Sequence, residues 1–250
     1  MLERDELTRY SRHIFLNEVG LAGQERLKAA RVFVVGAGGL GSPVLLYLAA
    51  AGVGHITCID ADHLELTNLQ RQILYTTDDL GALKAIRAGE HLARLNPHIE
   101  YQGIPDRLTA TNAAGYLRGH DLVIETSDNF ETKFLVNDTC FTLKQSLVMG
   151  GILRFEGQVF CIQPGQSACY RCIFFEPPPA EAVPNCAEAG VLGAIAGVVG
   201  SLQAAQALKI LSGASENPFG RLYSLDLLQG QIRSLPIERN PHCPLCAALR

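Results

Sequence analysis

Residues 31–41, RVFVVGAGGLG, join a short apolar run to a cluster of glycines. Val32–Val35 are β-branched or aromatic and predict a buried strand. Gly36, Gly38 and Gly41 follow at the G-x-G-x-x-G spacing, and an apolar helical pattern comes next. In such a turn the glycines let a phosphate approach the backbone, and the first N–H groups of the helix point at it. The stretch therefore predicts a nucleotide site, with a tight turn that binds nothing as the alternative.

The second predicted strand, His55–Ile59, ends in an acidic residue, Asp60. Dinucleotide-binding proteins place a ribose-binding carboxylate about 20 residues after the glycines, which is where Asp60 lies. The glycines and Asp60 favour NAD(P) or FAD by motif alone. They do not identify the nucleotide.

The order of the predicted elements indicates the fold class. Helices are expected over Glu3–Leu16, Gly20–Ala30, Leu45–Ala51, Ala82–Leu95, Thr109–Leu117 and Phe130–Leu143, and further strands over Ile99–Ile104, Asp121–Glu125 and Leu147–Met149. Strands that alternate with helices are typical of a doubly wound parallel sheet.

The pattern changes in the second part of the chain. Phe155–Ile162 and Leu222–Leu235 have strand character that turn residues interrupt, which predicts antiparallel strands added at an edge. We therefore expect one α/β domain over 1–250, with a Rossmann-like mixed sheet. Its parallel, nucleotide-binding half covers about 1–150, and its second half, with the antiparallel edge strands, covers about 151–250.

Composition narrows the functional classes. The 250 residues are 48% hydrophobic, which allows a sizeable core, and the net charge of −4 gives no general basic surface. Nucleic-acid binding is therefore not expected. Residues 1–13 are charged and lack the apolar segment of a secretory signal. The most apolar segment, Gly190–Leu211, is interrupted by polar side chains, so we expect a helix buried in a cytoplasmic protein rather than a membrane span.

Polar residues gather where the predicted parallel strands end. They are Asp60, Asp62, Ser127, Asp128 and Asn129 after strands, Asn68, Gln70, Arg71 and Gln72 in a loop, and Lys84 at the start of a helix. A dinucleotide relies mainly on backbone N–H groups, whereas a reacting triphosphate needs side-chain cations and a carboxylate for Mg²⁺. Arg71, Lys84 and Asp128 are groups of this kind, although each alone could be a solvated loop charge.

Two C-x-x-C pairs, Cys169/Cys172 and Cys243/Cys246, predict a metal site. Each pair offers two thiolates from one turn, and a tetrahedral set of four thiolates suits zinc. Because 70 residues separate the pairs, such a site would tie the C-terminal segment to the rest of the chain. Unligated, reduced cysteines are the alternative. A redox-active pair is disfavoured because neither pair is expected to open a helix after a strand.

The other cysteines fall into two groups. Cys58, Cys140 and Cys161 lie in predicted strands and helices and are interpreted as core residues. Cys186 lies in a polar loop that follows a proline-rich segment and precedes the apolar helix. A thiol near a helix N-terminus can have a lowered pKa and act as a nucleophile, with an incidental cysteine as the alternative.

These motifs together resemble the ThiF/MoeB/HesA family, the bacterial relatives of ubiquitin-activating E1 enzymes. The resemblance covers nearly the whole chain. It is carried by YSRH at 10–13, VGAGGLGS at 35–42, AAGVG at 50–54, TNLQRQ at 67–72, LNPH at 95–98, TSDN at 126–129, RFEGQ at 154–158, CYRC at 169–172, NCAEAGVLG at 185–193 and CPLC at 243–246. TNLQRQ combined with paired C-x-x-C motifs is specific to this family, whereas the glycine motif alone is not.

The resemblance implies an ATP-dependent adenylyltransferase. Family members activate the C-terminal Gly-Gly carboxylate of a small ubiquitin-like sulfur-carrier protein of the MoaD or ThiS kind as an acyl-adenylate, using Mg²⁺ and releasing pyrophosphate. A sulfur donor, such as a cysteine desulfurase, then allows a thiocarboxylate to form for molybdopterin or thiamine biosynthesis. The residues of these motifs are more similar to those of the molybdopterin branch, MoeB. We expect sulfur to come from a separate donor, because no rhodanese-like extension follows residue 246.

The resemblance also implies roles for individual residues. Asn68, Arg71 and Lys84 would bind the triphosphate, Asp128 would hold Mg²⁺, and Arg12 would reach the neighbouring subunit's site in a homodimer. The nucleotide would be held by these residues together with Gly36, Gly38, Gly39, Gly41, Asp60, Asp62, Thr67, Gln70 and Asn129. Zinc would be held by the four paired cysteines in the half of the domain over about 151–250, which would also bind the carrier protein. Cys186 occupies the position that, in the thiamine branch, links covalently to the carrier.

Two other functional classes fit part of the sequence. An NAD(P)-dependent Rossmann oxidoreductase accounts for the glycines and Asp60 but leaves Arg71, Lys84 and Asp128 without a task. A non-catalytic scaffold that binds a ubiquitin-like protein would keep the fold, but the intact set of Arg12 and these three residues argues against it.

Overall fold

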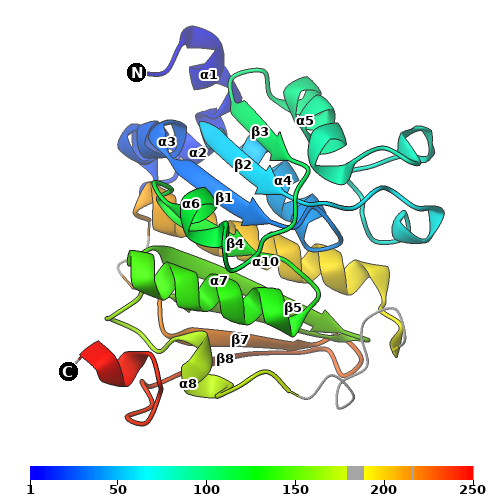
Figure 1. The fold of residues 1–250 in the computed structure, drawn as a ribbon. Helices are drawn as coiled ribbons and strands as arrows, with labels where there is room; N and C mark the ends of the chain where they lie inside the picture. Colours follow the sequence, from blue (N-terminus) through cyan, green and yellow to red (C-terminus); the bar gives the residue numbers. More distant parts are fainter. Residues whose placement is uncertain (179–188, 215–216, 250) are drawn as a thin grey trace.

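A computed structural model describes residues 1–178, 189–214 and 217–249. Its described strands form one eight-stranded sheet in the order β3-β2-β1-β4-β5-β6-β7-β8 (Figure 1). They are β1 (Arg31–Val35), β2 (His55–Ile59), β3 (Glu100–Ile104), β4 (Leu122–Glu125), β5 (Ser146–Leu153), β6 (Glu156–Ile162), β7 (Arg221–Asp226) and β8 (Gln231–Pro236). β3 to β5 pair in parallel and β5 to β8 antiparallel, which confirms the predicted mixed sheet.

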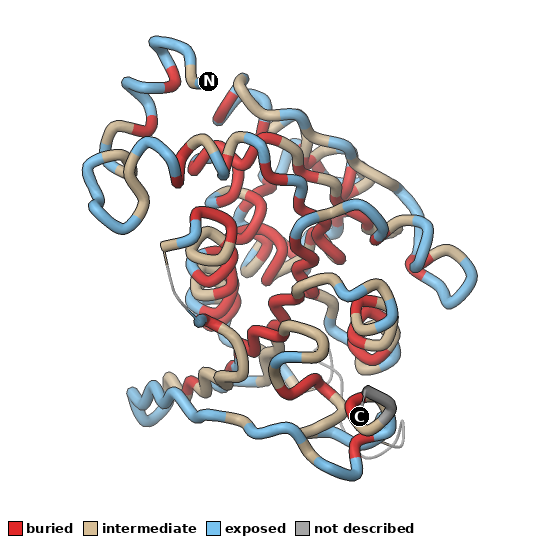
Figure 2. The backbone as a smooth tube through the Cα atoms, turned by 90° about the vertical axis from the view of Figure 1, so that its left-hand side faces the viewer, coloured by how far each residue is buried: buried red, intermediate tan, exposed pale blue. Residues whose placement is uncertain are grey.

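Helices cover both faces of the sheet (Figure 1). They are α1 (Arg4–Arg9), α2 (Ser11–Ile14), α3 (Gly20–Ala29), α4 (Gly41–Ala50), α5 (Lys84–Leu95), α6 (Ala113–Leu117), α7 (Phe130–Leu143), α8 (Tyr170–Ile173) and α10 (Gly193–Ser212). Alternate residues of β1 divide between two cores: Val32 and Val34 pack with α4, α5 and α10, and Phe33 and Val35 with α6, α7 and the cysteine segments. Buried residues are concentrated in the interior of the molecule, as Figure 2 shows. All residues of β4 are buried, whereas β8 is exposed throughout.

The apolar segment predicted over Gly190–Leu211 forms α10, which packs against β4, β5, β6, α3 and α4. By length and composition it is the one described helix that could cross a membrane, but half of its most apolar window is buried in the protein. Gly200 lies so close to α4 that a Cβ there would be 2.5 Å from Pro43 and 2.6 Å from the Leu40 carbonyl oxygen. The small residues of α10 therefore serve close packing.

Several predicted elements were wrong in their extent: α6 begins at Ala113 rather than Thr109, and α4 begins at Gly41 rather than Leu45. The helix expected over Glu3–Leu16 is two short helices, because Tyr10 turns inward at the junction and its hydroxyl accepts a hydrogen bond from Asn96 Nδ2 at 2.8 Å. The strand expected to end at Met149 continues as β5 through both glycines to Leu153. Gly150 has no side chain to displace the Gln203 amide of α10, to which a Cβ would come within 2.3 Å.

Candidate functional site

The glycine turn between β1 and α4 is closed by contacts that only glycine permits. Gly36 has φ +98°, the left-handed region that other residues disfavour. A Cβ on Gly41 would lie 2.2 Å from the Gly36 carbonyl oxygen. In the described part of the chain, the N–H groups of Gly38 and Gly39 have no acceptor. The turn therefore offers unpaired donors next to a helix N-terminus, as an anion requires.

A pocket of about 950 Å³ lies at the carboxyl ends of the parallel strands. Most residues predicted from the sequence line it: Gly36, Gly38, Gly39, Asp60, Asp62, Asn68, Arg71, Lys84, Asp128 and Asn129. They come from the loops after β1, β2 and β4 and from the first turn of α5. The expectation that these strand ends converge is thus met by the geometry.

Asp60 is held rigidly in this pocket. Its Oδ2 accepts a hydrogen bond from the Ala37 N–H at 2.7 Å and its Oδ1 accepts one from the Asp62 N–H at 2.9 Å. Burial raises the pKa of Asp60, although the two N–H groups and the nearby Lys84 charge oppose that rise. The carboxylate thus braces the glycine turn and still faces the pocket.

Two cations of the pocket, Lys84 and Arg71, are each held by a neighbouring oxygen atom. Lys84 begins α5, its side chain is buried, and its Nζ pairs with Asp62 Oδ2 at 2.9 Å. Arg71 follows the short helix η1 (Leu66–Asn68), and its Nη1 donates to the Thr67 carbonyl at 3.1 Å. The aliphatic part of Arg71 packs beside Gly39, where a Cβ would lie 3.4 Å from it.

A buried ion pair supports the loop that carries Asp128. Glu125 at the end of β4 is fully buried, and Lys133 Nζ of α7 donates to its Oε2 at 2.5 Å. Lys133 Nζ also donates to the Ser127 carbonyl at 2.8 Å, while the Ser127 N–H donates to Glu125 Oε1 at 2.7 Å. Burial raises the pKa of Glu125, against the opposing charge and hydrogen bonds of Lys133. The pair fixes the turn in front of Asp128.

Four predicted site residues do not line the pocket, and one lies outside the described residues. Gly41 forms the second part of the turn, the Thr67 hydroxyl donates to Glu65 Oε2 at 3.3 Å, and Gln70 packs against Gly193 of α10. Arg12 is exposed on α2, and no partner for it is found among the described residues. Cys186 is the residue outside the described ranges.

The pocket also contains residues that the predicted set lacked. Asp106, Arg107, Leu108 and Thr109 follow β3, and Thr126 follows β4. Asn112 and Tyr116 brace the first of these loops through hydrogen bonds to Asp106 Oδ2 at 3.4 and 3.0 Å. The rule that ligands lie beyond parallel strand ends would have included the loop after β3, but no recognised motif marks it.

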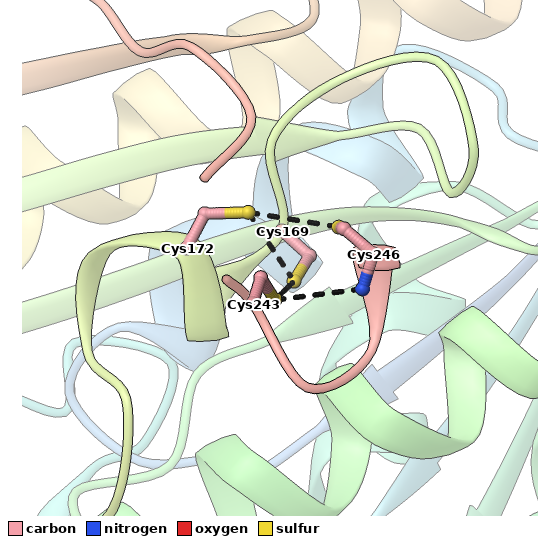
Figure 3. A group of neighbouring side chains, drawn as sticks. All are labelled: Cys169, Cys172, Cys243 and Cys246. Carbon is pink, nitrogen blue, oxygen red and sulfur yellow. Dashed lines mark hydrogen bonds between the residues drawn. The ribbon is translucent and has the colours of Figure 1, made fainter. Parts of the chain in front are cut away.

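The four paired cysteines meet in one cluster, with their side chains pointing toward one another (Figure 3). Their sulfurs lie within 4.8 Å of each other, at 3.9 Å for Cys169–Cys172 and 3.6 Å for both Cys169–Cys243 and Cys172–Cys246. A tetrahedral ion with metal–sulfur bonds of about 2.3 Å requires sulfurs about 3.8 Å apart. The Cys246 N–H also donates to Cys243 Sγ at 3.5 Å. The donor set fits a tetrahedral metal ion.

The remaining described cysteines are core residues, as predicted. Cys58, Cys140 and Cys161 are fully buried, and burial raises the pKa of each thiol. One argument from the sequence was wrong, because Cys169 does precede a short helix, α8, as its N-cap residue. The convergence of the two pairs nevertheless gives each cysteine three sulfur neighbours, an arrangement typical of a closed metal site.

The mixed sheet, the glycine turn and the polar pocket at the strand ends define an α/β protein of the Rossmann-like class. Comparison with protein families then shows that the chain belongs to the ThiF family, whose model matches residues 10–245. The resemblance recognised in the sequence is thereby confirmed.

Individual proteins similar to the chain carry related names. The sulfur carrier protein adenylyltransferase of Thermus thermophilus is 50% identical over 97% of this chain and 92% of its own length. The adenylyltransferase and sulfurtransferase MOCS3 of Culex quinquefasciatus is 46% identical over 98% of this chain, which spans only 56% of that relative. A crystal structure of E. coli MccB with ATP has a TM-score of 0.82 and 27% identity, covering 95% of this chain and 73% of that one.

Proposed function

We propose that the protein adenylates the C-terminal Gly-Gly carboxylate of a small ubiquitin-like sulfur-carrier protein, using ATP. The observation that carries the proposal is the convergence of unpaired glycine N–H groups, Arg71, Lys84 and Asp128 in one pocket of about 950 Å³. The name of the Thermus thermophilus relative supports the choice of substrate. An NAD(P) oxidoreductase would use the turn and Asp60 but not the two cations.

The proposed chemistry needs no general base, because a C-terminal carboxylate is already ionised at neutral pH. A carboxylate oxygen forms a bond to the α-phosphorus while the bond to pyrophosphate breaks. The contribution of the protein is then alignment and neutralisation of the phosphate charge. Arg71, Lys84 and the Gly38 N–H provide positive charge, and Asp60 would bind the ribose. Asp128 would hold Mg²⁺, which shields the phosphates from the approaching anion.

We infer that the cysteine cluster holds zinc in a structural role. Four thiolates leave no open position for a substrate, and zinc is the common ion for tetrahedral sulfur sites. The site joins α8 to the short helix η3 (Cys246–Leu249) at the C-terminal end of the chain. Zinc binding would therefore stabilise the second half of the molecule rather than take part in adenylation.

We also propose a homodimer in which Arg12 completes the partner's pocket. Arg12 lies outside the pocket of its own chain, on α2. Large apolar side chains are exposed close to it in sequence, with Phe15 at 73% and Leu16 at 50%. These exposed apolar side chains support the proposal of an interface near Arg12. Mixing Arg12→Ala and Asp128→Ala chains should restore part of the activity, and no recovery after subunit exchange would argue against action in trans.

The remaining assignments rest on the resemblance. We place the protein in the cytoplasm and in molybdopterin biosynthesis rather than thiamine biosynthesis, with sulfur supplied by a separate donor such as a cysteine desulfurase. In the thiamine-type route Cys186 would act after pyrophosphate has left. Cys186→Ala would then leave adenylation unchanged.

The test is pyrophosphate exchange into ATP, measured with each purified candidate carrier. We expect exchange that depends on a carrier with an intact Gly-Gly end and on Mg²⁺. A carrier lacking its last glycine is the matched control. Tight binding of NAD with no binding of ATP, measured by calorimetry, would contradict the proposed function.

A further inference from the structure

Tyr75 is a buried side chain that the proposed chemistry does not use. It lies in the loop between η1 and η2 (Thr77–Asp79), with 6% of its surface exposed. Its hydroxyl is 2.9 Å from the Ala37 carbonyl oxygen and 3.2 Å from the Lys84 carbonyl oxygen. The Tyr75 hydroxyl thus hydrogen-bonds to the main chain of both the glycine turn and the first residue of α5. These are the two main-chain segments that carry the phosphate-binding groups of the pocket.

The bond to Ala37 has a consequence for the next residue. In a trans peptide unit the C=O of one residue and the N–H of the following residue point in opposite directions. The Ala37 carbonyl points inward, to Tyr75, so the Gly38 N–H points the other way, and Gly38 lines the pocket. That N–H has no acceptor in the described part of the chain. Tyr75 therefore aims a free donor into the pocket.

The Tyr75 ring is itself fixed in place. The His91 ring lies edge-on to it, with the ring centroids 6.4 Å apart, and His91 Nε2 is 2.8 Å from Asp79 Oδ2. Asp79 is buried and also pairs with Arg87 at 2.9 Å. Burial opposes ionisation of Asp79, but hydrogen bonds from Thr76 and His91 outweigh it, so its pKa is lowered. Asp79 thus links Arg87 and His91 of α5, and the His91 ring packs against Tyr75.

We propose that Tyr75 is a positioning residue for triphosphate binding. Its hydroxyl holds the Ala37–Gly38 peptide in the orientation that presents the Gly38 N–H to a phosphate oxygen, and it ties this peptide to the main chain of Lys84. The inference rests on the proposed function, since it names the ligand as a nucleoside triphosphate. It predicts a defect confined to the phosphate part of the nucleotide.

The variant that tests this role is Tyr75→Phe, which keeps the ring and removes the hydroxyl. Affinity for ATP should fall about tenfold, the effect of losing one net hydrogen bond to a buried group. Affinity for adenosine, which has no phosphate, should be unchanged. In pyrophosphate exchange the KM for ATP should rise while the KM for the carrier stays constant.

Tyr101→Phe is the matched control. The Tyr101 hydroxyl donates to the Ala85 carbonyl at 2.7 Å, on the same turn of α5, but it makes no contact with the glycine turn. This variant should keep the wild-type affinity for ATP. An equal loss in both variants would overturn the inference, because the cause would then be a loosened α5. An equal loss for ATP and adenosine in Tyr75→Phe would overturn it as well.

A measurement on the wild-type chain covers the case in which Tyr75→Phe does not fold. Amide hydrogen exchange at Gly38 should be fast in the free protein and slow with ATP. Absence of that protection in a protein that binds ATP would contradict the orientation assigned to this N–H, without affecting the proposed function. A wild-type protein that does not bind ATP would contradict the proposed function itself and the inference with it.

Discussion

The parallel and antiparallel halves of the sheet bring polar side chains together by different routes. In the parallel half, β1 to β4 all end at one edge, so the loops after each strand converge on one pocket. In the antiparallel half, successive strands end at opposite edges, and no such convergence follows from strand order. The cysteine cluster there forms because a turn after β6 meets the C-terminal segment after β8.

This difference separates a site that can bind a substrate from one that can only join chain segments. The pocket keeps the unpaired main-chain N–H groups of Gly38 and Gly39 and a large open volume, whereas each cysteine already faces three others. A closed set of four ligands has no position for a reacting group. The comparison predicts that changes in the two halves affect different measurements: catalysis for the pocket, stability for the cluster.

The largest effect is expected from loss of a cluster ligand, as in Cys172→Ser. Metal binding stabilises only the folded chain, and free zinc at a thousandfold excess over its dissociation constant contributes about 4 kcal/mol. The variant should lose bound zinc and much of this free energy of unfolding, measured by metal analysis and denaturant titration. Cys161→Ser, at a buried cysteine outside the cluster, should keep its zinc. A zinc-free Cys172→Ser protein of wild-type stability would refute the structural role.

The second-largest effect is expected from Asp128→Ala in the pocket. Removing one electrostatic contact at a reacting centre commonly costs on the order of 10²–10³ in rate, or about 3–4 kcal/mol. Pyrophosphate exchange should fall by that factor, while zinc content and the unfolding midpoint stay at wild-type values. Asp106→Ala is the control, since this carboxylate also lines the pocket but already binds Tyr116 and Asn112. Equal losses in both variants would mean that only overall negative charge matters.

Local sequence patterns predicted most of the parallel half. The glycine turn and Asp60 are close in sequence to their strands, and each carries a spacing that follows from backbone geometry. The cysteine pairs were predicted in the same way, because the spacing within each pair is a property of one turn. The sequence therefore predicts those site groups whose role depends on a few residues that are neighbours in the chain.

The groups that were missed depend on contacts between different elements of the fold. Glu125 was predicted only as the last residue of a strand. Its ion-pair partner, Lys133, lies in α7, the helix that follows this strand. The acceptors of the Tyr75 hydroxyl lie 38 and 9 residues away, at Ala37 and Lys84. In sequence such residues resemble ordinary core or loop positions. Only the packing of α5 and α7 against the strand ends reveals which atoms they reach.

The smallest effect is expected at the contact between the two regions, where Arg171 of α8 meets α7. Its guanidinium donates to both Asp138 oxygens at 2.8 Å and lies 4.7 Å from the centre of the Phe134 ring. Because both side chains are partly exposed, solvent screens the pair, and we expect the contact to contribute about 1 kcal/mol. Arg171→Ala should lower the free energy of unfolding by about this amount.

A double-mutant cycle with Asp138→Ala separates the ion pair from the loss of packing on Phe134. The Asp138 contact lies near the middle of α7, and the N-cap of that helix, Asn129, lines the pocket at the strand ends. If the cluster half only braces the fold, Arg171→Ala should leave the KM for ATP unchanged in pyrophosphate exchange. A KM for ATP that rises as the free energy of unfolding falls would contradict the separation of the two regions. It would mean that α7 couples the cysteine cluster to the pocket.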